Sequence, residues 1–222
     1  MIAGDIFILL ILPLYLWQSH WHICCTCASI RLGGFKMVKQ GINIGCGNQI
    51  FKSTKDIQWM NLDCVALDGV DCILDLEQFP YSLKSDFFDY IYCHQTLEHL
   101  SDKVKVMNEL YRISKNGAII DIHVPYFSNC GAFCHAEHQS FFGYNTFDYW
   151  CNSSNEMCPD AHFRMISRKI EFSGTPRFPM QILNAIITPL INISKFTALF
   201  YQRFFCWILP CENLIVKLEV KK

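Results

Sequence analysis

The sequence predicts an α/β protein with an open, mostly parallel sheet that holds a ligand at the carboxyl ends of its strands. Between residues 41 and 93, short apolar runs of strand length each end in a glycine, a carboxylate or a small polar residue. Strand-length apolar runs are the signal for buried strands, and open parallel sheets bind ligands just outside the carboxyl ends of those strands. We therefore expect the residues that end these runs to form a ligand crevice.

Two glycines and an aspartate indicate what the crevice holds. Gly45 and Gly47 follow the first run, and because they lack a Cβ they let the backbone approach a ligand closely. Asp63 ends the second run, roughly 20 residues on, where a carboxylate can accept hydrogen bonds from two ribose hydroxyls. The loop lacks the third glycine of the dinucleotide pattern, and the chain has no G-x-x-x-x-G-K-[ST] motif. The sequence thus favours a nucleoside without phosphates.

Several motifs in this order resemble class I S-adenosylmethionine-dependent methyltransferases. They are Ile42–Gly47, Asn61–Asp63, Asp75–Leu76, Phe88–Asp89, His94–Leu100 and Leu110–Ala118. The nearest likeness is to small methyltransferase-domain proteins linked to glycan or cell-surface biosynthesis, whose later segments are similar to Val124–Ser128 and His138–Tyr149. The resemblance covers about residues 40–222. It implies a Rossmann-like fold, with a seven-stranded, mostly parallel sheet, an antiparallel last strand and helices on both faces.

The resemblance also implies transfer of a methyl group from S-adenosylmethionine to oxygen or nitrogen of a small-molecule or glycan-linked acceptor. The cofactor-binding positions that it implies are Asn43, Gly45, Cys46, Gly47, Asp63, Asp75, Leu76, His94 and Gln95. Asp63 would bind the ribose, and Asp75 with Leu76 would flank the adenine. His94 and Gln95 would lie beside the methyl donor.

Two departures from the family pattern leave an alternative open. Asn43 stands where the family commonly has an acidic residue, and Asn116 with Ala118 stands where it usually has proline and glycine. These changes motivate a second hypothesis, in which the chain is a catalytically inactive binding or scaffold protein that has kept the fold. Affinity for the cofactor separates the two hypotheses.

Methyl transfer needs proximity, orientation and sometimes a base for the acceptor's proton. The base must lie at the strand ends, which makes His94, His123, Tyr126 and His138 the candidates. Histidine has the ordinary pKa best suited to this work. The competing interpretation is that His94 and His123 merely end strands and bond to the backbone. Glu98, at the start of the following helical turn, is expected to be structural.

A second set of residues has the side chains of a zinc site. Cys130, Cys134, His135 and His138 supply four zinc-capable ligands within a short stretch. Their spacing matches neither common zinc-finger pattern, and in the resembled family only the histidine matching His138 stands out. We therefore expect no metal here, and expect this loop to act as a lid over the acceptor pocket.

Composition limits the class of protein. With 222 residues of which 51% are hydrophobic, the chain is long enough for one domain with a sizeable core. A formal net charge of −1 gives no basic footprint for nucleic acid. Thirteen scattered cysteines, mostly inside apolar runs, indicate free thiols in a reducing compartment. We expect a cytoplasmic protein, and the sequence does not predict its oligomeric state.

Two apolar segments need separate treatment. Residues 1–36 are an apolar extension outside the expected domain of residues 37–222, and their apolar run is shorter than the roughly 20 residues of a membrane span. Residues 175–210 form an apolar helical insertion before the last strand. The favoured interpretation of the insertion is a helical pair packed on the sheet or at a dimer contact. The alternative is a surface for a membrane or a lipid-linked acceptor, which would make the protein membrane-associated.

The rest of the chain predicts further regular elements. Ser101 is expected to cap a helix, and Gly117 to end it in a left-handed cap. Residues 118–124, 163–172 and 213–220 are expected to be strands, and residues 145–150 a short helix or turn.

Overall fold

The computed structural model describes residues 37–151, 162–174 and 178–222. The chain divides into two units, Met1–Phe35 and Lys36–Lys222. All that follows concerns the second unit, and the domain boundary expected from the sequence at residue 37 stays a prediction. The apolar extension predicted for residues 1–36 lies outside the described residues.

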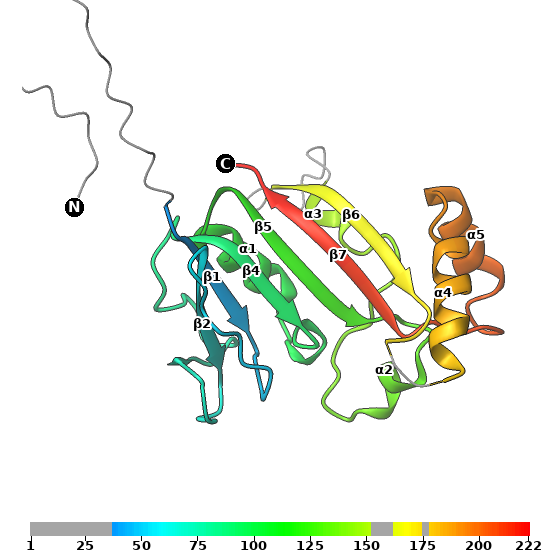
Figure 1. The fold of residues 1–222 in the computed structure, drawn as a ribbon, viewed down its shortest axis with the longest axis horizontal. Coiled ribbons are helices and arrows are strands. Elements are labelled where there is room, and N and C mark those ends of the chain that lie inside the picture. The colour runs from blue at the N-terminus through cyan, green and yellow to red at the C-terminus, as the bar shows by residue number, and fades with distance from the viewer. Residues whose placement is uncertain (1–36, 152–161, 175–177) are drawn as a thin grey trace, which may run out of the picture. The chain divides into compact units, whose positions relative to one another are not determined.

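Seven strands form one sheet in the order β3-β2-β1-β4-β5-β7-β6 (Figure 1). They are β1 (Lys39–Ile44), β2 (Ile57–Asp63), β3 (Cys72–Ile73), β4 (Phe88–His94), β5 (Ser114–Pro125), β6 (Phe163–Glu171) and β7 (Asn213–Val220). Neighbours from β3 to β5 are parallel, whereas β7 runs antiparallel to both β5 and β6. The predicted fold class is confirmed, including the inserted antiparallel last strand.

One face of the sheet is the core of the domain. Ile42, Ile91, Ile120 and Leu218 pair across four strands, and all four are fully buried. Because side chains alternate between the two faces of a strand, these residues share one face. Helix α1 (Lys103–Ile113) packs its apolar stripe into the same cluster. The apolar residues from which these strands were predicted are therefore the ones that point into the core.

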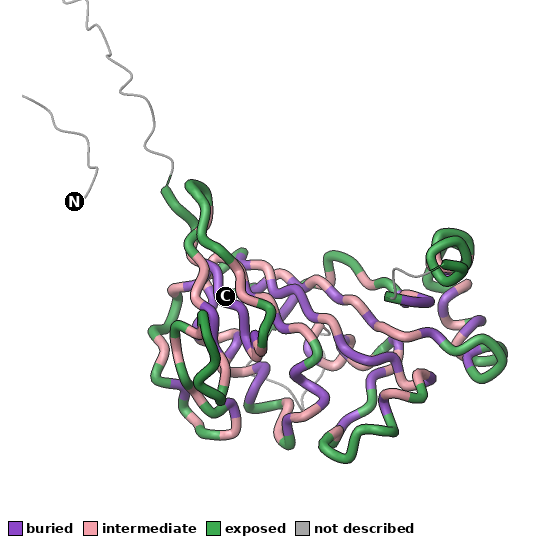
Figure 2. Tube along the Cα trace, turned by 60° about the horizontal axis from the view of Figure 1, so that its bottom comes forward, coloured by how far each residue is buried: buried purple, intermediate pink, exposed green. Residues whose placement is uncertain are grey.

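The opposite face is aromatic, polar and half-exposed. Trp59, Tyr90, Tyr92, His94 and His123 lie on it in neighbouring strands. Figure 2 shows buried and half-exposed residues alternating along the strands, a pattern most regular in β7. Residues 45–87, all described, contain no helix. The helices expected on both faces are therefore absent from the connections of this half of the sheet.

Helix α1 begins and ends differently from the prediction. Its N-cap is Asp102, whose side chain accepts a hydrogen bond from Lys105 N, because Ser101 instead bonds to Glu77. The helix ends at Ile113 and passes directly into β5, so Gly117, with a φ of 78°, lies within β5 rather than in a helix cap. The remaining short elements are η1 (Leu97–His99), α2 (Cys130–Cys134) and α3 (Asp148–Cys151).

The insertion forms two helices, α4 (Met180–Ile191) and α5 (Lys195–Phe204), beside the edge strand β6 (Figure 1). Side chains of α4 and of the residue after it bond to the backbone of this edge, where a neighbouring strand would otherwise bond. Asn192 both accepts from Ile170 N and donates to Ile170 O, and Thr188 accepts from Phe172 N. These bonds satisfy backbone groups that an edge strand otherwise leaves open.

Most of the apolar side chains of this helical pair and of the segments beside it are exposed. The expectation that they pack on the sheet is wrong for them, whereas the expected alternative of a dimer contact stays a prediction. We call them the apolar helical surface; its members are Ile182, Leu183, Ile186, Leu190, Ile193, Phe196, Phe200, Phe204, Phe205, Trp207, Ile208 and Leu209. Among the described residues, no single helix is long and apolar enough to span a membrane. Helices α4 and α5 pass the same test only as a pair, with a bend of 113° between them.

Candidate active site

The loop after β1 has the backbone geometry of a close ligand contact. Gly45 and Gly47 have φ values of 64° and 49°, in the left-handed region that favours glycine. A Cβ at Gly45 would lie 2.3 Å from Thr96 Oγ1, whereas one at Gly47 would meet no atom within 4 Å. Because Gly45 has no Cβ, the loop can pack against Thr96, which lies just after β4. The backbone at Gly47 borders open space.

Asp63 fixes this loop and retains room for a ligand. Its Oδ2 accepts from Gly47 N at 2.7 Å, and its Oδ1 accepts from Val65 N at 3.1 Å. A carboxylate has about four acceptor positions, so acceptor capacity remains on both oxygens. Ile73 pairs with Asp63 in the sheet and is 63% exposed. This apolar surface beside the carboxylate suits a nucleoside base, and sequence reasoning missed it because β3 has only two residues.

Asn43 and Cys46 lie behind the loop. Asn43 is buried and its amide donates to Gln49 O at 2.7 Å and to Asn61 Oδ1 at 3.3 Å. Cys46 is also buried, and burial, together with the charge of Asp63, raises the pKa of its thiol. Both side chains therefore hold the loop in shape, and a direct contact with the cofactor stays a prediction for them.

The two residues predicted to flank adenine differ in their placement. Asp75 is exposed, and its carboxylate accepts from Glu77 N at 2.9 Å. Leu76 is buried in the core, and its carbonyl accepts from the Tyr81 hydroxyl at 3.0 Å. Asp75 is therefore the more accessible of the two at the end of β3.

The structure brings His94 and His123 together at the ends of β4 and β5. Their ring centroids are 4.7 Å apart, nearly perpendicular, and His94 Nδ1 lies 3.3 Å from Gln49 Oε1. Burial and the neighbouring His123 lower the pKa of His94, although Asp121 acts in the opposite direction. The His94 ring is thus neutral at pH 7 and fit to accept a proton.

Asp121 is the carboxylate behind this pair, and the sequence analysis did not select it. Its oxygens lie 3.2 Å from His123 Nε2, 3.0 Å from Lys217 Nζ and 2.6 Å from the Tyr90 hydroxyl. Burial alone would raise its pKa, but the contacts with His123, Tyr90 and Lys217 outweigh burial and lower the pKa to about 2. The signal was present in the sequence, since Asp121 and His123 are two residues apart on one strand and so share a face.

Gln95 links the two strand ends. It has a φ of 50°, a conformation uncommon outside glycine. Its N–H donates to His123 O at 2.8 Å, and its side chain donates to Asn213 Oδ1 at 3.2 Å. Residues held in such conformations cluster at functional sites. Gln95 is exposed, and its place beside the methyl donor stays a prediction.

Tyr126 is not placed to act as a base, which corrects the sequence-based proposal. It is fully buried, its hydroxyl donates to Gln202 Oε1 at 3.0 Å, and burial raises its pKa far above the ordinary value. Pro125 was expected to end the buried strand, but Tyr126 after it is also buried in the core.

His138 belongs to a different group. Its ring lies 4.7 Å from the ring of His99 and 4.9 Å from that of His135. Cys130 and Cys134, predicted as its companions, are exposed free thiols. Beside His99 is Glu98, which is buried, and burial raises the pKa of its carboxyl to about 7.

Residues 42–122 match the family model described as "Methyltransferase domain". This range includes the glycine loop, Asp63 and the His94–Gln95 strand end. Over these residues the chain is similar to class I S-adenosylmethionine-dependent methyltransferases, and its sheet has the Rossmann-like order expected for that fold. The methyl donor of this class is S-adenosylmethionine, and the open backbone at Gly47 with the spare acceptor capacity of Asp63 fits its ribose and methionine portions.

One similar solved structure supports this fold, and two others are similar over most of their length. A putative sarcosine dimethylglycine methyltransferase from Galdieria sulphuraria superposes with a TM-score of 0.50 at 11% identity, covering 82% of this chain and 78% of that one. The YcgJ protein from Bacillus subtilis gives 0.49 at 17% identity, with 83% and 92% covered. A SAM-dependent methyltransferase from Archaeoglobus fulgidus gives 0.48 at 15% identity, with 83% and 87% covered. No curated protein is significantly similar in sequence.

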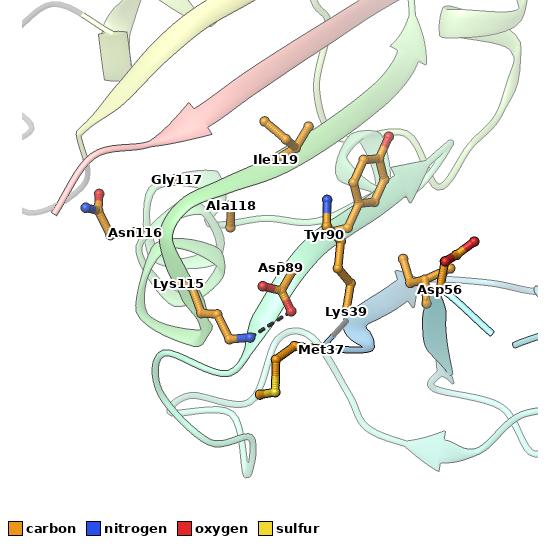
Figure 3. Close-up of a pocket in the computed structure, with 11 residues that line it drawn as sticks. Met37, Lys39, Asp56, Asp89, Tyr90, Lys115, Asn116, Gly117, Ala118 and Ile119 are labelled. Carbon is orange, nitrogen blue, oxygen red and sulfur yellow. Dashed lines mark hydrogen bonds and ion pairs between the residues drawn. The ribbon is translucent and has the colours of Figure 1, made fainter. Parts of the chain in front are cut away.

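The methyltransferase domain also has a cavity of about 470 Å³ at the amino ends of β1, β4 and β5, away from the glycine loop (Figure 3). In its wall, Lys115 Nζ lies 2.7 Å from Asp89 Oδ2, which also accepts from Gln40 N at 2.8 Å. Although burial opposes them, these bonds lower the pKa of Asp89. None of the residues predicted for the cofactor lines this cavity, so we place no part of the methyl-transfer site there.

Proposed function

We propose that this protein transfers a methyl group from S-adenosylmethionine to oxygen or nitrogen of an acceptor at the carboxyl ends of β1, β2 and β4. The observation that carries the proposal is the bond between Gly47 N and Asp63 Oδ2, at 2.7 Å. It ties a left-handed glycine loop to a carboxylate with free acceptor positions, which is the arrangement that a ribose and a close backbone contact require.

When bound, the cofactor would supply an electrophilic methyl group, carried on a sulfonium, to a lone pair of the acceptor. His94 is the residue that we assign to the acceptor's proton. When its Nδ1–H donates to Gln49 Oε1, its Nε2 is left with a free lone pair. Asp121 stands behind the pair and stabilises the imidazolium that forms on His94.

The acceptor that we favour is a small or glycan-linked molecule carried on a lipid. The apolar helical surface is exposed on the same domain, and its aromatic side chains suit the interface of a bilayer. Arg203 in the last turn of α5 and Lys195 in its first turn supply positive charge for anionic headgroups. We therefore propose that the protein works at a membrane surface.

Calorimetric titration of the full chain with S-adenosylmethionine and its demethylated product tests the cofactor site. The Asp63→Asn variant keeps the shape of the side chain but loses its charge, so we expect binding to weaken by about 10- to 100-fold. Asp86→Asn is the matched control, because Asp86 lies before β4, is largely exposed and has a positive φ that asparagine tolerates. Equal affinity in wild type and Asp63→Asn, or no binding by folded wild type, would remove the proposal.

Two further outcomes separate the alternatives. Tight cofactor binding without transfer to any lipid-linked or soluble glycan acceptor would favour the inactive binding or scaffold protein. Co-sedimentation with vesicles of phosphatidylcholine and phosphatidylserine tests the membrane proposal. We expect Phe196→Ser with Trp207→Ser to abolish co-sedimentation, and Phe133→Ser, an exposed aromatic residue outside the apolar helical surface, to leave it unchanged. Wild type that stays in the supernatant would contradict membrane association.

A further inference from the structure

Three metal-capable side chains meet between η1 and the loop that follows α2. Glu98, His99 and His138 each offer one donor atom, and the three donors lie within 4.8 Å of one another. Glu98 and His99 are adjacent in η1, whereas His138 comes from a loop about 40 residues later in the chain. The fold, and not local sequence, brings them together.

The carboxylate of this group lacks a partner. Glu98 is 1% exposed, and neither of its carboxylate oxygens has a hydrogen-bond partner among the described residues. Buried polar groups in folded proteins are nearly always hydrogen-bonded, and buried charges are paired or bind metals. Here the groups next to the carboxylate are two imidazoles, which are themselves metal ligands when neutral.

The histidines are oriented as metal ligands usually are. His138 Nδ1 lies 3.0 Å from Ala132 O, so Nδ1 carries the proton and Nε2 presents a lone pair. A second hydrogen bond of this kind fixes the tautomer and ring orientation of most metal-bound histidines. His99 is half-buried, and its ring centroid lies 4.7 Å from that of His138.

Backbone bonds hold the two segments in register before any ion binds. Gln139 N donates to Glu98 O at 2.7 Å, and the Gln139 side chain donates to His99 O at 3.0 Å. The residue next to His138 is thus fixed to both other members of the group. Lys103 Nζ reaches Ser140 Oγ further along the same loop. Such preorganisation lowers the cost of binding.

We infer that Glu98, His99 and His138 form a binding site for a divalent transition metal, and that Zn²⁺ is the ion it fits best. Two imidazoles and one carboxylate are an established donor set for zinc, with bonds of about 2.0–2.2 Å. Tetrahedral bonds of that length place the donors about 3.4 Å apart, so the side chains must close by roughly 1 Å around the ion. At least one coordination position remains for water, for a substrate oxygen or for His135. The site is separate from the proposed cofactor site, and its test does not depend on methyl transfer.

Equilibrium titration of the chelator-treated full chain with ZnCl₂, in competition with a chromophoric chelator, tests the inference. The chain carries Cys130→Ser and Cys134→Ser, because exposed thiols bind zinc adventitiously. We expect one equivalent of high-affinity zinc, at least 100-fold weaker binding in Glu98→Gln and in His138→Asn, and no change in Asp68→Asn. Asp68 is the control, since it is an exposed carboxylate that does not belong to the cluster.

Folding is followed separately by thermal unfolding in the presence of chelator. Because Glu98→Gln removes an unpartnered charge, we expect it to be at least as stable as the parent without metal. The Co²⁺-substituted protein should show visible absorption and no thiolate charge-transfer band. Absence of stoichiometric zinc from the folded parent, or equal zinc affinity in the parent and in Glu98→Gln, would overturn the inference.

Discussion

Two pairs of histidines flank the segment that leaves β4, and they are built alike but completed differently. His94 and His123 have ring centroids 4.7 Å apart, as do His99 and His138. Each pair also has a buried carboxylate beside it. Asp121 receives hydrogen bonds or ion pairs from Tyr90, His123 and Lys217, whereas Glu98 has no partner among the described residues.

The difference shows that a carboxylate–histidine cluster is defined by its other contacts. Asp121 is neutralised within the protein, so its pair of histidines is a complete unit that can hold and release a proton. Glu98 has no hydrogen-bond partner among the described residues and lies beside two imidazoles, so a bound cation would balance its charge. Identical residue types therefore indicate general-base chemistry in one place and a metal in the other.

The largest contrast is expected when each carboxylate is replaced by an apolar side chain in metal-free protein. Asp121→Leu leaves Lys217, His123 and Tyr90 without their partner, and we expect a loss of about 3 kcal/mol. Glu98→Met removes an unpartnered charge, and we expect a gain of about 1 kcal/mol or more. Urea denaturation in the presence of chelator measures the free energy of unfolding of both variants. Equal destabilisation by the two changes would contradict the proposed difference between the two carboxylates.

Turnover should depend on the first pair. With any acceptor that the protein methylates, we expect His94→Gln to lower kcat by about 100-fold or more, as for loss of a general base. His162→Gln, a change at an exposed histidine before β6, is the control. Rapid-quench measurement of the transfer step gives the comparison. A variant with unchanged kcat would reduce His94 to a structural residue.

The pH dependence of stability should report Asp121. Its folded pKa of about 2 lies below the ordinary value of 3.8, so ionisation of Asp121 favours the folded state. That contribution is complete above about pH 4 and is lost as the pH falls towards 2. We expect Asp121→Asn to cost about 1–2 kcal/mol at pH 7, after allowance for partial screening by solvent. Urea titrations from pH 7 to pH 2.5 should show the gap between wild type and variant narrowing.

The smallest effect is expected from the exposed cysteines. Cys130→Ser and Cys134→Ser should leave the affinity of the high-affinity zinc unchanged within about twofold, because neither thiol belongs to the Glu98 cluster. Competition titration measures this directly. A large loss of affinity would favour the ligand set suggested by the sequence spacing instead.

Site features formed by residues close together in the sequence could be predicted. The glycine loop, Asp63 and the strand-end histidines follow from apolar runs and the residues that end them, because local chain direction decides their placement. The partner of His123 was equally local, since Asp121 precedes it by two positions on β5.

Features that depend on how distant segments return to the sheet were not predictable. Glu98 and His138 meet only because the loop after α2 folds back on η1, and their separation along the chain hides this. The helical periodicity of residues 180–204 identified an apolar face correctly. Periodicity does not say what covers such a face, and in the described chain nothing does.

The hydrogen bonds between α4 and β6 have a practical consequence for anyone shortening this chain. Deleting the two apolar helices is the obvious route to a better-behaved protein. It would also strip Asn192 and Thr188 from the outer edge of the sheet and bare the backbone groups of Ile170 and Phe172. A bare edge recruits strands from other copies and promotes aggregation. Polar substitutions on the outer surface of α4, with its inner side chains kept, are the safer design.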